Sequence, residues 1–310
     1  MPRETAAGER RVALIPEDVR RLVADADVLV EHDAGRLIGR TDADFRAAGA
    51  TVVDRATVFA RSDVVAWVKP PVYELDSLIR PGMTLLGFQD PIVRREVIAG
   101  FRTCDVESVG FETVPHEYPD IDALSAMSRI AGAVAYVQGR QLLPAEARER
   151  PVRSLILGCG QAGRAAITAA VEARDEPPTA LGNHREQEAI AIRHGARRFL
   201  LSPAGAEFLD HLAAEPPDLI IGAAVHRGSR GPVLIDEEVL NALRPGTVII
   251  DLVGKSGGNC VAMVPNRTVT LPNGVIVTHC SNYPAMRPVE ASRAYSAAVA
   301  AMIKTRILAA

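Results

Sequence analysis

Short apolar runs alternate with longer segments of helical composition along most of the chain, after a polar stretch at residues 2–11. The runs have the length and apolar content of buried strands, and the segments between them have the spacing of helices that cover a sheet. The expected strands are 28–31, 51–53, 64–68, 84–86, 106–110, 219–224, 248–253 and 275–278, and the expected helices include 42–48, 92–99 and 289–308. This alternation predicts an α/β fold with parallel sheets and helices on both faces.

Local chemistry marks the start or end of two helices. Residues 12–15 should be extended, and the helix after them opens on Pro16-Glu17-Asp18. Proline fits the first helical turn, and acids there lie near the positive end of the helix dipole. A long Ala-rich helix is expected over residues 121–143, where Pro144 ends it. A helix of that length suits the connection between two domains.

The stretch 153–170 reads RSLILGCGQAGRAAITAA, an apolar run followed by a glycine turn and an Ala-rich segment. A strand, a G-x-G-x-x-G turn and a helix in this order form the phosphate-binding unit of dinucleotide folds. The positions assigned to the cofactor here are Gly158 for the tight turn, Gly160 for close approach of the diphosphate, Gln161, Ala162, and Gly163 for packing of the helix on the strand. The diphosphate would rest on the helix N-terminus, where unpaired N–H groups favour an anion. The alternative is a glycine turn in another kind of α/β domain.

Composition narrows the functional classes. With 310 residues the chain is long enough for two domains, and a net charge of −3 gives no basic footprint for nucleic acid. The four cysteines (Cys104, Cys159, Cys260 and Cys280) are far apart, so neither a metal site nor a disulfide framework is expected. No apolar run reaches the roughly 18 to 20 residues of a membrane span, so we expect no membrane insertion and a cytoplasmic location.

The end of the second strand after the glycine turn bears on the choice of cofactor. In most NAD-binding folds an acid about 20 residues beyond the turn hydrogen-bonds the ribose 2′-hydroxyl. Here Asn183 takes that place, followed by His184 and Arg185. A neutral amide beside a guanidinium would accept a 2′-phosphate, so NADP is slightly favoured over NAD. The alternative is that Arg185 is a solvated side chain and the adenosine contact is loose.

Six motifs occur in an order that resembles one enzyme family. They are RRVALIPED (10–18), WVKPP (67–71), FETVP (111–115), MSRIAG (127–132), LGCGQAG (157–163) and IIDLVGKSGGNC (249–260). Together they resemble the alanine dehydrogenase and NAD(P) transhydrogenase α-subunit family over nearly the whole chain. The stretches GERRVALIP and IRPGMTLLGFQDP also resemble N5-(carboxyethyl)ornithine synthase, a shorter member that reductively condenses pyruvate with an amine using NADPH.

The resemblance implies two Rossmann-like doubly wound domains with a cleft between them. The first would be a substrate domain of residues 1–124 and 286–310, and the second an NAD(P)-binding domain of residues 125–285. Relatives form dimers or hexamers, so a homo-oligomer is expected, with a dimer favoured. The ligand besides the cofactor would be a small amino or oxo acid, and neither nucleic acid nor a metal is implied.

The resemblance also implies roles for individual residues. Arg11 and Lys69 match residues that hold the substrate's carboxylate and oxo group, which suits a guanidinium clamp and an ammonium that polarises a carbonyl. The alternative is that both are ordinary surface charges. The other positions matched to the cofactor site are Ser128, Val225, Asp251 and Asn282, of which Asp251 would lie beside the nicotinamide.

The chain departs from the family at the positions that handle protons. Asp90 stands where alanine dehydrogenase has its catalytic histidine, and Lys255 stands where it has a catalytic aspartate. With this reversed polarity, Lys255 would donate a proton and Asp90 would orient it. His279 is a further candidate acid–base group, although a packed or solvated histidine is the favoured interpretation.

Two stretches at other places also differ from the family pattern. His116-Glu117-Tyr118-Pro119 replaces a basic loop of the transhydrogenases, which argues against that branch. Relatives open on an apolar strand before a Pro-basic-Glu turn, whereas this sequence opens on Met1-Pro2-Arg3-Glu4. Either the start lies upstream or the first sheet lacks that strand.

Three hypotheses follow. The leading one is an NAD(P)-dependent oxidoreductase of the CH–NH class, which transfers a hydride to or from an α-amino, imino or oxo acid. Reductive condensation of an oxo acid with an amine is one form of it. The second is a partner-dependent subunit that exchanges hydride with another nucleotide-bound protein, as a transhydrogenase α-subunit does. The third is a catalytically silent NAD(P)-binding protein.

Overall fold

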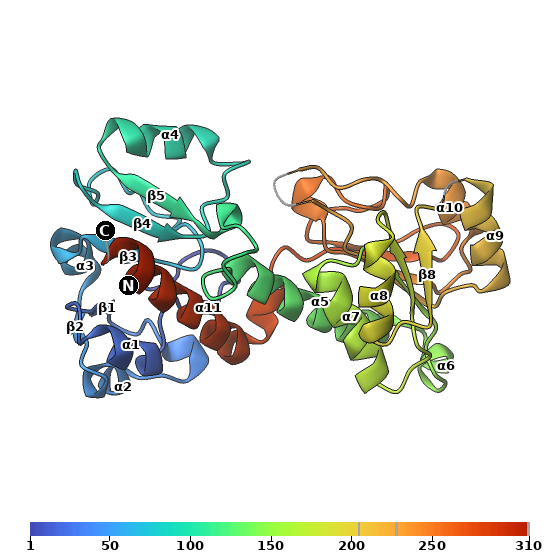
Figure 1. Ribbon diagram of the computed structural model, residues 1–310, viewed down its shortest axis with the longest axis horizontal. Coiled ribbons are helices and arrows are strands. Elements are labelled where there is room, and N and C mark those ends of the chain that lie inside the picture. The colour runs from blue at the N-terminus through green and yellow to red at the C-terminus, as the bar shows by residue number, and fades with distance from the viewer. Residues whose placement is uncertain (204, 227–228, 309–310) are drawn as a thin grey trace. The chain divides into compact units, whose positions relative to one another are not determined.

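The computed structural model describes residues 1–203, 205–226 and 229–308, and the chain divides into two compact units (Figure 1). Unit 1 is Met1–Met127 with Pro284–Ala310, and unit 2 is Ser128–Tyr283. Both are built from parallel strands and helices, so the predicted α/β class is confirmed.

Unit 1 contains five short strands in two parallel sheets. The strands are β1 (Leu29–Glu31), β2 (Thr51–Val53), β3 (Val64–Ala66), β4 (Thr84–Gly87) and β5 (Glu107–Gly110). β1 pairs with β2, and β3, β4 and β5 form a three-stranded sheet in that order. The backbone of Met1 accepts from and donates to Glu31 and Leu29 along the other edge of β1, at 2.9 and 2.7 Å. That contact is too short to continue the sheet to β3, so the single sheet expected for this region is split.

The helices of unit 1 hold its N-terminal segment. They are α1 (Pro16–Leu22), α2 (Asp42–Ala47), α3 (Arg55–Arg61), α4 (Arg95–Thr103) and α11 (Pro288–Met302), and α11 packs against α1 (Figure 1). Residues 12–15 are buried and join no strand; instead Val12 N–H donates to Ser292 Oγ (3.0 Å) and Ile15 N–H to Ser296 Oγ (2.9 Å). Serine hydroxyls of α11 therefore replace a neighbouring strand as partners for this backbone.

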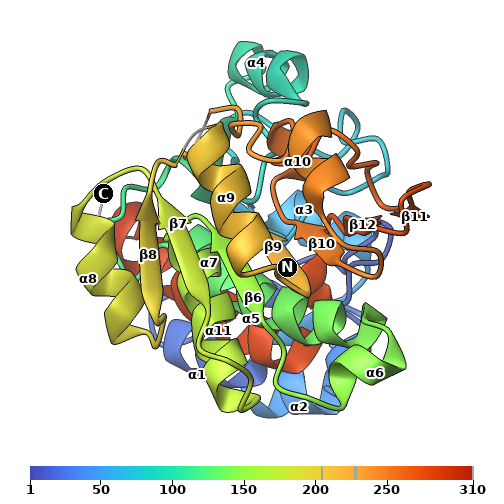
Figure 2. The same cartoon turned by 90° about the vertical axis from the view of Figure 1, so that its right-hand side faces the viewer.

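Unit 2 is built on a seven-stranded sheet. Its strands are β6 (Ser154–Leu157), β7 (Thr179–Gly182), β8 (Arg198–Leu201), β9 (Leu219–Gly222), β10 (Val248–Asp251), β11 (Thr268–Thr270) and β12 (Ile276–Thr278). The order β11-β12-β10-β9-β6-β7-β8 is parallel except for β11, and Figure 2 shows β8 and β11 at the two edges. Without β11, this is the 3-2-1-4-5-6 order of dinucleotide-binding sheets.

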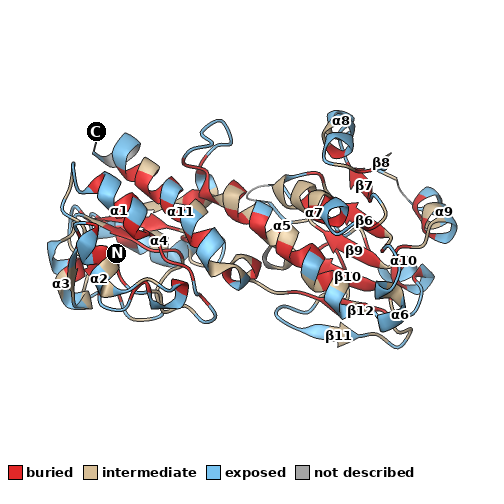
Figure 3. Cartoon of the chain, turned by 90° about the horizontal axis from the view of Figure 1, so that it is seen from below, coloured by how far each residue is buried: buried red, intermediate tan, exposed pale blue. Residues whose placement is uncertain are grey.

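Helices cover both faces of that sheet. They are α5 (Ala123–Leu142), α6 (Ala145–Arg148), α7 (Gln161–Glu172), α8 (Glu186–Arg193), α9 (Ala206–Ala214) and α10 (Glu237–Ala242). The four central strands are buried throughout, as Figure 3 shows for β6, β9 and β10. Burial on both faces is the mark of a parallel sheet between two helix layers.

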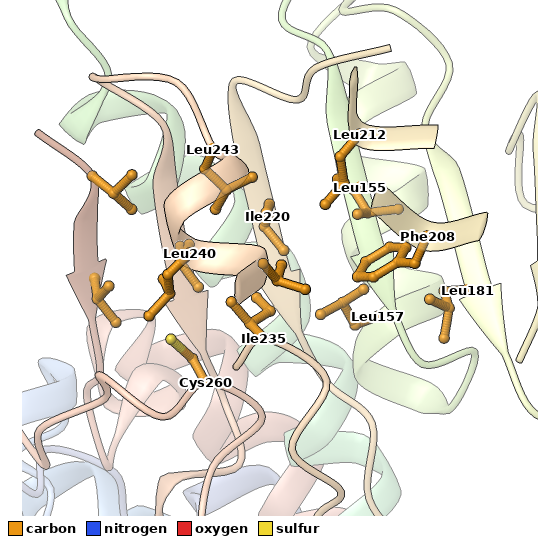
Figure 4. Close-up of a cluster of buried hydrophobic side chains, with 14 residues drawn as sticks. Leu155, Leu157, Leu181, Phe208, Leu212, Ile220, Ile235, Leu240, Leu243 and Cys260 are labelled. Atoms are coloured by element: carbon orange, nitrogen blue, oxygen red, sulfur yellow. The ribbon is translucent and has the colours of Figure 1, made fainter. Parts of the chain in front are cut away.

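Alternation along β6 divides its side chains between the two layers. Leu155 and Leu157 belong to one apolar cluster with Phe208 of α9 and Leu240 of α10 (Figure 4). Ile156 lies on the other face, where its Cγ2 is 3.5 Å from the Cβ position of Gly163 in α7. The strand is therefore fixed from both sides just before the glycine turn.

Two details of the sequence expectations changed. The helix expected at residues 92–99 is α4, which begins at Arg95, because Asp90 and Pro91 first form a turn in which Asp90 O accepts from the N–H groups of Val93 and Arg94. The edge strands β8 and β11 were not expected; their residues are mostly exposed or half-buried and lack a continuous apolar run. The long helix expected at residues 121–143 is confirmed as α5.

We expect Gly132→Ala to destabilise the protein, because a Cβ at Gly132 of α5 would lie 1.9 Å from the carbonyl oxygen of Ala162 in α7. Both contacting atoms belong to backbone, so relief requires moving a helix, at a cost of about 3 kcal/mol or more. Urea unfolding followed by circular dichroism measures the change. Gly100→Ala in exposed α4, where no described atom lies within 4 Å of the added Cβ, is the control and should be neutral or stabilising. Equal stability of the two variants would contradict the helix contact.

Candidate functional site

The glycine turn after β6 is closed on its protein side and open at its tip. Gly158 has φ +100°, and a Cβ there would lie 2.7 Å from Ala223 O. A Cβ on Gly163 would lie 1.8 Å from Gly158 O, so both positions fit only glycine. At Gly160, directly before α7, no described atom lies within 4 Å of the Cβ position. The turn thus leaves space for an anion at the N-terminus of a twelve-residue helix that begins with Gln161 and Ala162.

The strand order reverses at β6, and ligands of open α/β sheets bind at the carboxyl ends of the strands at such a point. Asn259 joins the loops there: its Oδ1 accepts from Ala224 N–H at 2.9 Å, and its Nδ2 donates to the carbonyls of Ala224 and Pro232, both at 2.8 Å. Asn259 is fully buried, whereas the next residue of the first loop, Val225, is 43% exposed. The amide therefore fixes the backbone that presents Val225.

Asn183, His184 and Arg185 lie at the carboxyl end of β7 and are exposed. The side-chain oxygen of Gln187 accepts from the N–H groups of Asn183 and His184, at 2.9 and 3.2 Å. Asn183 Nδ2 lies 3.4 Å from Nε2 of His226, which follows β9. The strand end therefore presents an amide next to basic side chains, as the sequence pattern predicts, and its role in cofactor choice stays a prediction.

Asp251 turns its carboxylate into the loop after β10. Its Oδ1 accepts from Val253 N–H at 2.8 Å, and its Oδ2 accepts from the N–H groups of Asn259 and Cys260, at 2.6 and 3.0 Å. The side chain is fully buried, and this burial raises the pKa of Asp251 against the effect of the three hydrogen bonds. The carboxylate shapes this loop, and a place beside the nicotinamide stays a prediction.

Four further candidate positions can be located individually. Ser128 is partly buried in α5, and Asn282 is partly buried after β12. Lys255 lies in the short helix Gly254–Ser256, and its side chain is outside the described residues. His279 is 4% exposed and its Nδ1 accepts from Asn266 N–H at 2.9 Å, so it is a packed histidine.

Arg11 and Lys69 come together in unit 1 around a carboxylate, Glu9. Arg11 donates to Glu9 through Nε at 2.7 Å and through Nη2 at 2.6 Å, and both side chains are buried. Burial by itself would raise the pKa of Glu9, but the hydrogen bonds and charge of Arg11, aided by Lys69, hold it below its usual value. Arg11 is therefore part of a buried ion pair, and the alternative of an ordinary surface charge is wrong for this residue.

Glu4 and Tyr295 hold the turn that carries Lys69. The two carboxyl oxygens of Glu4 accept from the N–H groups of Val68 (2.6 Å) and Lys69 (3.1 Å). The hydroxyl of Tyr295, on α11, donates to Trp67 O at 2.8 Å. Burial raises the pKa of Glu4 to about 8, so its carboxyl is mostly protonated at pH 7.

Asp90 follows β4 as Lys69 follows β3, each three residues beyond the strand end, and the two strands are parallel neighbours. Asp90 has φ +56°, which costs energy for a residue with a side chain. Glu112, which follows β5, accepts from the N–H groups of Gln89 and Asp90, at 2.9 and 2.7 Å, and so holds that conformation. The pairing of Asp90 with Lys255 stays a prediction.

Sequence reasoning missed several residues that organise these sites, namely Glu4, Glu9, Glu112 and Asn259. Glu112 had a usable signal, because its place directly after an expected strand is the same as that of Asp90. Among the described residues, no group of three or more His, Cys, Asp or Glu side chains is arranged to hold a metal ion. None of the described helices has both the length and the apolar character needed to cross a membrane.

The strand order and glycine turn place unit 2 in the class of dinucleotide-type Rossmann folds. Residues 1–131 match the model of the alanine dehydrogenase/PNT N-terminal domain, and residues 131–308 match that of the alanine dehydrogenase/PNT C-terminal domain. The chain therefore belongs to the alanine dehydrogenase/PNT family.

Individual relatives come from both branches. NAD(P) transhydrogenase subunit alpha of Cereibacter sphaeroides is 29% identical over 334 residues, which span 97% of this chain and 64% of that subunit. The first of the separate chains that make up NAD(P) transhydrogenase subunit alpha in Rhodospirillum rubrum is 30% identical over 94% of this chain and 85% of its own length. Alanine dehydrogenase of Halomonas elongata is 29% identical over 83% and 72%, respectively.

Solved structures with the same fold also come from both branches. A transhydrogenase from Sinorhizobium meliloti superposes with a TM-score of 0.89 at 24% identity, over 99% of this chain and 92% of that one. An L-alanine dehydrogenase superposes with a TM-score of 0.85 at 24% identity, over 99% and 90%. These likenesses establish the fold and leave the branch open.

The open space at Gly160 gives a direct test. Gly160→Ala should leave the free energy of unfolding within about 0.5 kcal/mol of wild type, because the added methyl group meets no protein atom. It should weaken NADPH and NADH binding at least tenfold, because the methyl group takes the space of the diphosphate. Fluorescence titration with each nucleotide measures the affinity. Gly163→Ala is the control, in which a clash with Gly158 O predicts lost stability; unchanged affinity in Gly160→Ala would contradict the assignment.

Proposed function

We propose that this protein is an NAD(P)-dependent oxidoreductase that transfers a hydride to or from a small α-amino, imino or oxo acid. The observation that carries the proposal is the buried cluster of Arg11, Lys69, Glu9 and Glu4 in unit 1. Family membership and the dinucleotide-type turn of unit 2 supply the cofactor class. In this proposal unit 1 is the substrate domain and unit 2 the cofactor domain.

The residues of unit 2 suit a pyridine dinucleotide. Gly160 and the first N–H groups of α7 would hold its diphosphate, and Asn183, His184 and Arg185 would face the adenosine ribose. A bound nicotinamide supplies or accepts the hydride. The absence of a carboxylate at Asn183 favours NADP over NAD, since an acid there would repel a 2′-phosphate.

The charges of unit 1 suit a monocarboxylate. Arg11 and Lys69 bring two cationic groups, whereas Glu9 is the one ionised carboxylate of the four while Glu4 keeps its proton. The cluster then carries one excess positive charge near neutral pH. A guanidinium would bind the acid group of the substrate, and the ammonium of Lys69 would polarise the adjacent carbonyl or imine.

Proton handling falls to Asp90 and Lys255 in this proposal. An imine or carbonyl that accepts a hydride must also gain a proton, and an ammonium is a suitable donor once its pKa is brought towards neutrality. Asp90 would orient that donor. The reverse reaction, oxidation of an amino acid, requires the same two groups to accept a proton.

A second candidate is a subunit that exchanges hydride with another nucleotide-bound protein. The names of the Cereibacter and Rhodospirillum relatives favour it, since both are transhydrogenase α-subunits. Hydride exchange between two nicotinamides needs no acid–base group. The buried cluster around Arg11 and Lys69 supports the acid-directed oxidoreductase instead, because an oxo acid needs this charge and a second nicotinamide does not.

Lys69→Ala tests the oxidoreductase. Purified wild-type protein, given NADPH and a panel of 2-oxo acids with and without amines, should oxidise the cofactor, followed at 340 nm. Lys69→Ala should lower kcat/KM by about 100-fold or more while NADPH affinity stays the same, because the group that polarises the substrate is lost. Lys304→Ala, on the surface beside Asp25, is the matched control and should retain activity.

The outcomes separate the candidates. No turnover with any acid, together with normal NADPH binding, would sink the oxidoreductase. Turnover that appears only after a nucleotide-bound membrane partner is added would establish the second candidate. Normal binding with neither activity would establish a silent nucleotide-binding protein.

Asn183→Asp tests the cofactor preference. A carboxylate at the end of β7 would repel a 2′-phosphate and accept a hydrogen bond from a 2′-hydroxyl. The dissociation constant for NADPH should rise about tenfold or more, whereas that for NADH should fall or stay the same. Asn241→Asp, on the exposed surface of α10, adds the same charge elsewhere and is the control. An equal change for both nucleotides would show that Asn183 does not face the ribose.

A further inference from the structure

We propose that Glu4 positions Lys69 and sets the charge of the cluster around it, so that acid substrates bind while the Glu4 carboxyl is protonated and are released as it ionises. The naming of the ligand as an acid rests on the proposed function. The link between Glu4 and Lys69 rests on the structure of unit 1 alone.

The positioning argument is geometric. Glu4 holds two successive N–H groups, those of Val68 and Lys69, with its two oxygens. Tyr295 holds the preceding carbonyl, that of Trp67, from α11. Three consecutive residues of the turn are therefore fixed by two side chains from distant regions of the chain. The backbone from which the Lys69 side chain extends has little freedom as long as Glu4 is in place.

The charge argument follows from the groups that face Glu4. Glu9 and Arg11 come from the same N-terminal segment, Lys69 and Tyr73 from the segment after β3, and Tyr295 from α11. Burial raises the pKa of Glu4 to about 8, the charge of Glu9 adds to this effect, and the two N–H groups and Arg11 oppose it. Ionisation of Glu4 would cancel the excess positive charge of the cluster. Acid ligands would then lose their electrostatic advantage as the pH passes this value.

The test measures the reactivity of Lys69, which requires no knowledge of the substrate. Wild type and Glu4→Gln are acetylated with trace acetic anhydride at pH 6 to 10, and modification of Lys69 is quantified by mass spectrometry. Lys304 serves as internal standard in the same sample. Glutamine keeps the shape of glutamate without its charge, and Glu17→Gln on exposed α1 is the matched control.

The Lys69 curves of wild type and Glu4→Gln should coincide below about pH 7. Above pH 8, Lys69 should react at least about threefold faster in Glu4→Gln, because in wild type the ionised Glu4 stabilises the unreactive ammonium. The Lys304 curves should not change. Parallel Lys69 curves over the whole range would overturn the proposal.

A kinetic measurement separates this proposal from the proposed function. With an oxo acid that is turned over, the KM of wild type should rise above pH 8 with little change in kcat, and Glu4→Gln should remove this rise. Divergent labelling without any turnover would uphold the Glu4–Lys69 link and reject the oxidoreductase. Turnover that depends on Lys69, with parallel labelling curves, would reject the link and uphold the oxidoreductase.

Discussion

Direct backbone contact at the start of α7 is the constraint on which unit 2 depends. The helix touches α5 at Gly132 and the glycine turn at Gly158 and Gly163, with no side chain at any of the three contacts. Side-chain packing tolerates small shifts because rotamers adjust, whereas backbone atoms in contact do not. The position of the helix N-terminus relative to β6 is therefore fixed, and the open space at Gly160 is a consequence of how closely its neighbours approach.

Unit 1 is organised by charge to a similar degree. A buried ion pair such as that between Arg11 and Glu9 adds little net stability, because removing both groups from water costs about as much as their attraction returns. The fold nevertheless supports the pair from several directions. The segment that carries it is tied to α11 through serine hydroxyls, and the turn with Lys69 is tied through Glu4 and Tyr295. Much of the architecture of unit 1 thus serves to keep cationic groups in place.

The sequence predicted the fold best where one pattern determined the outcome. The apolar run, glycine turn and Ala-rich helix at residues 153–170 allowed only one local structure, and α5 was long enough to be unambiguous. The edge strands β8 and β11 escaped because exposed residues erase the apolar signal. The helix α4 was placed three residues early because the left-handed conformation of Asp90 is decided by Glu112, a residue 22 positions away.

The candidate sites were predictable to a smaller extent for the same reason. Single residues such as Arg11, Lys69 and Asn183 could be named from motifs, since their neighbours in sequence are distinctive. Their partners could not. Glu4 and Glu9 lie in a polar stretch that has the composition of a solvated loop, and only the tertiary structure shows that both are buried against the turn after β3.

The same partners bear on whether the protein is a silent nucleotide-binding protein. Binding of a dinucleotide to unit 2 needs the glycine turn and the ends of its strands, and none of these involves Arg11 or Glu9. For stability alone, apolar residues of similar volume would serve unit 1 as well as the buried pair or better. A raised pKa at Glu4 makes the arrangement costlier still above neutral pH. An acid ligand gives a reason for this cost, because it takes up the positive charge that the cluster leaves in excess, and a silent protein gives none.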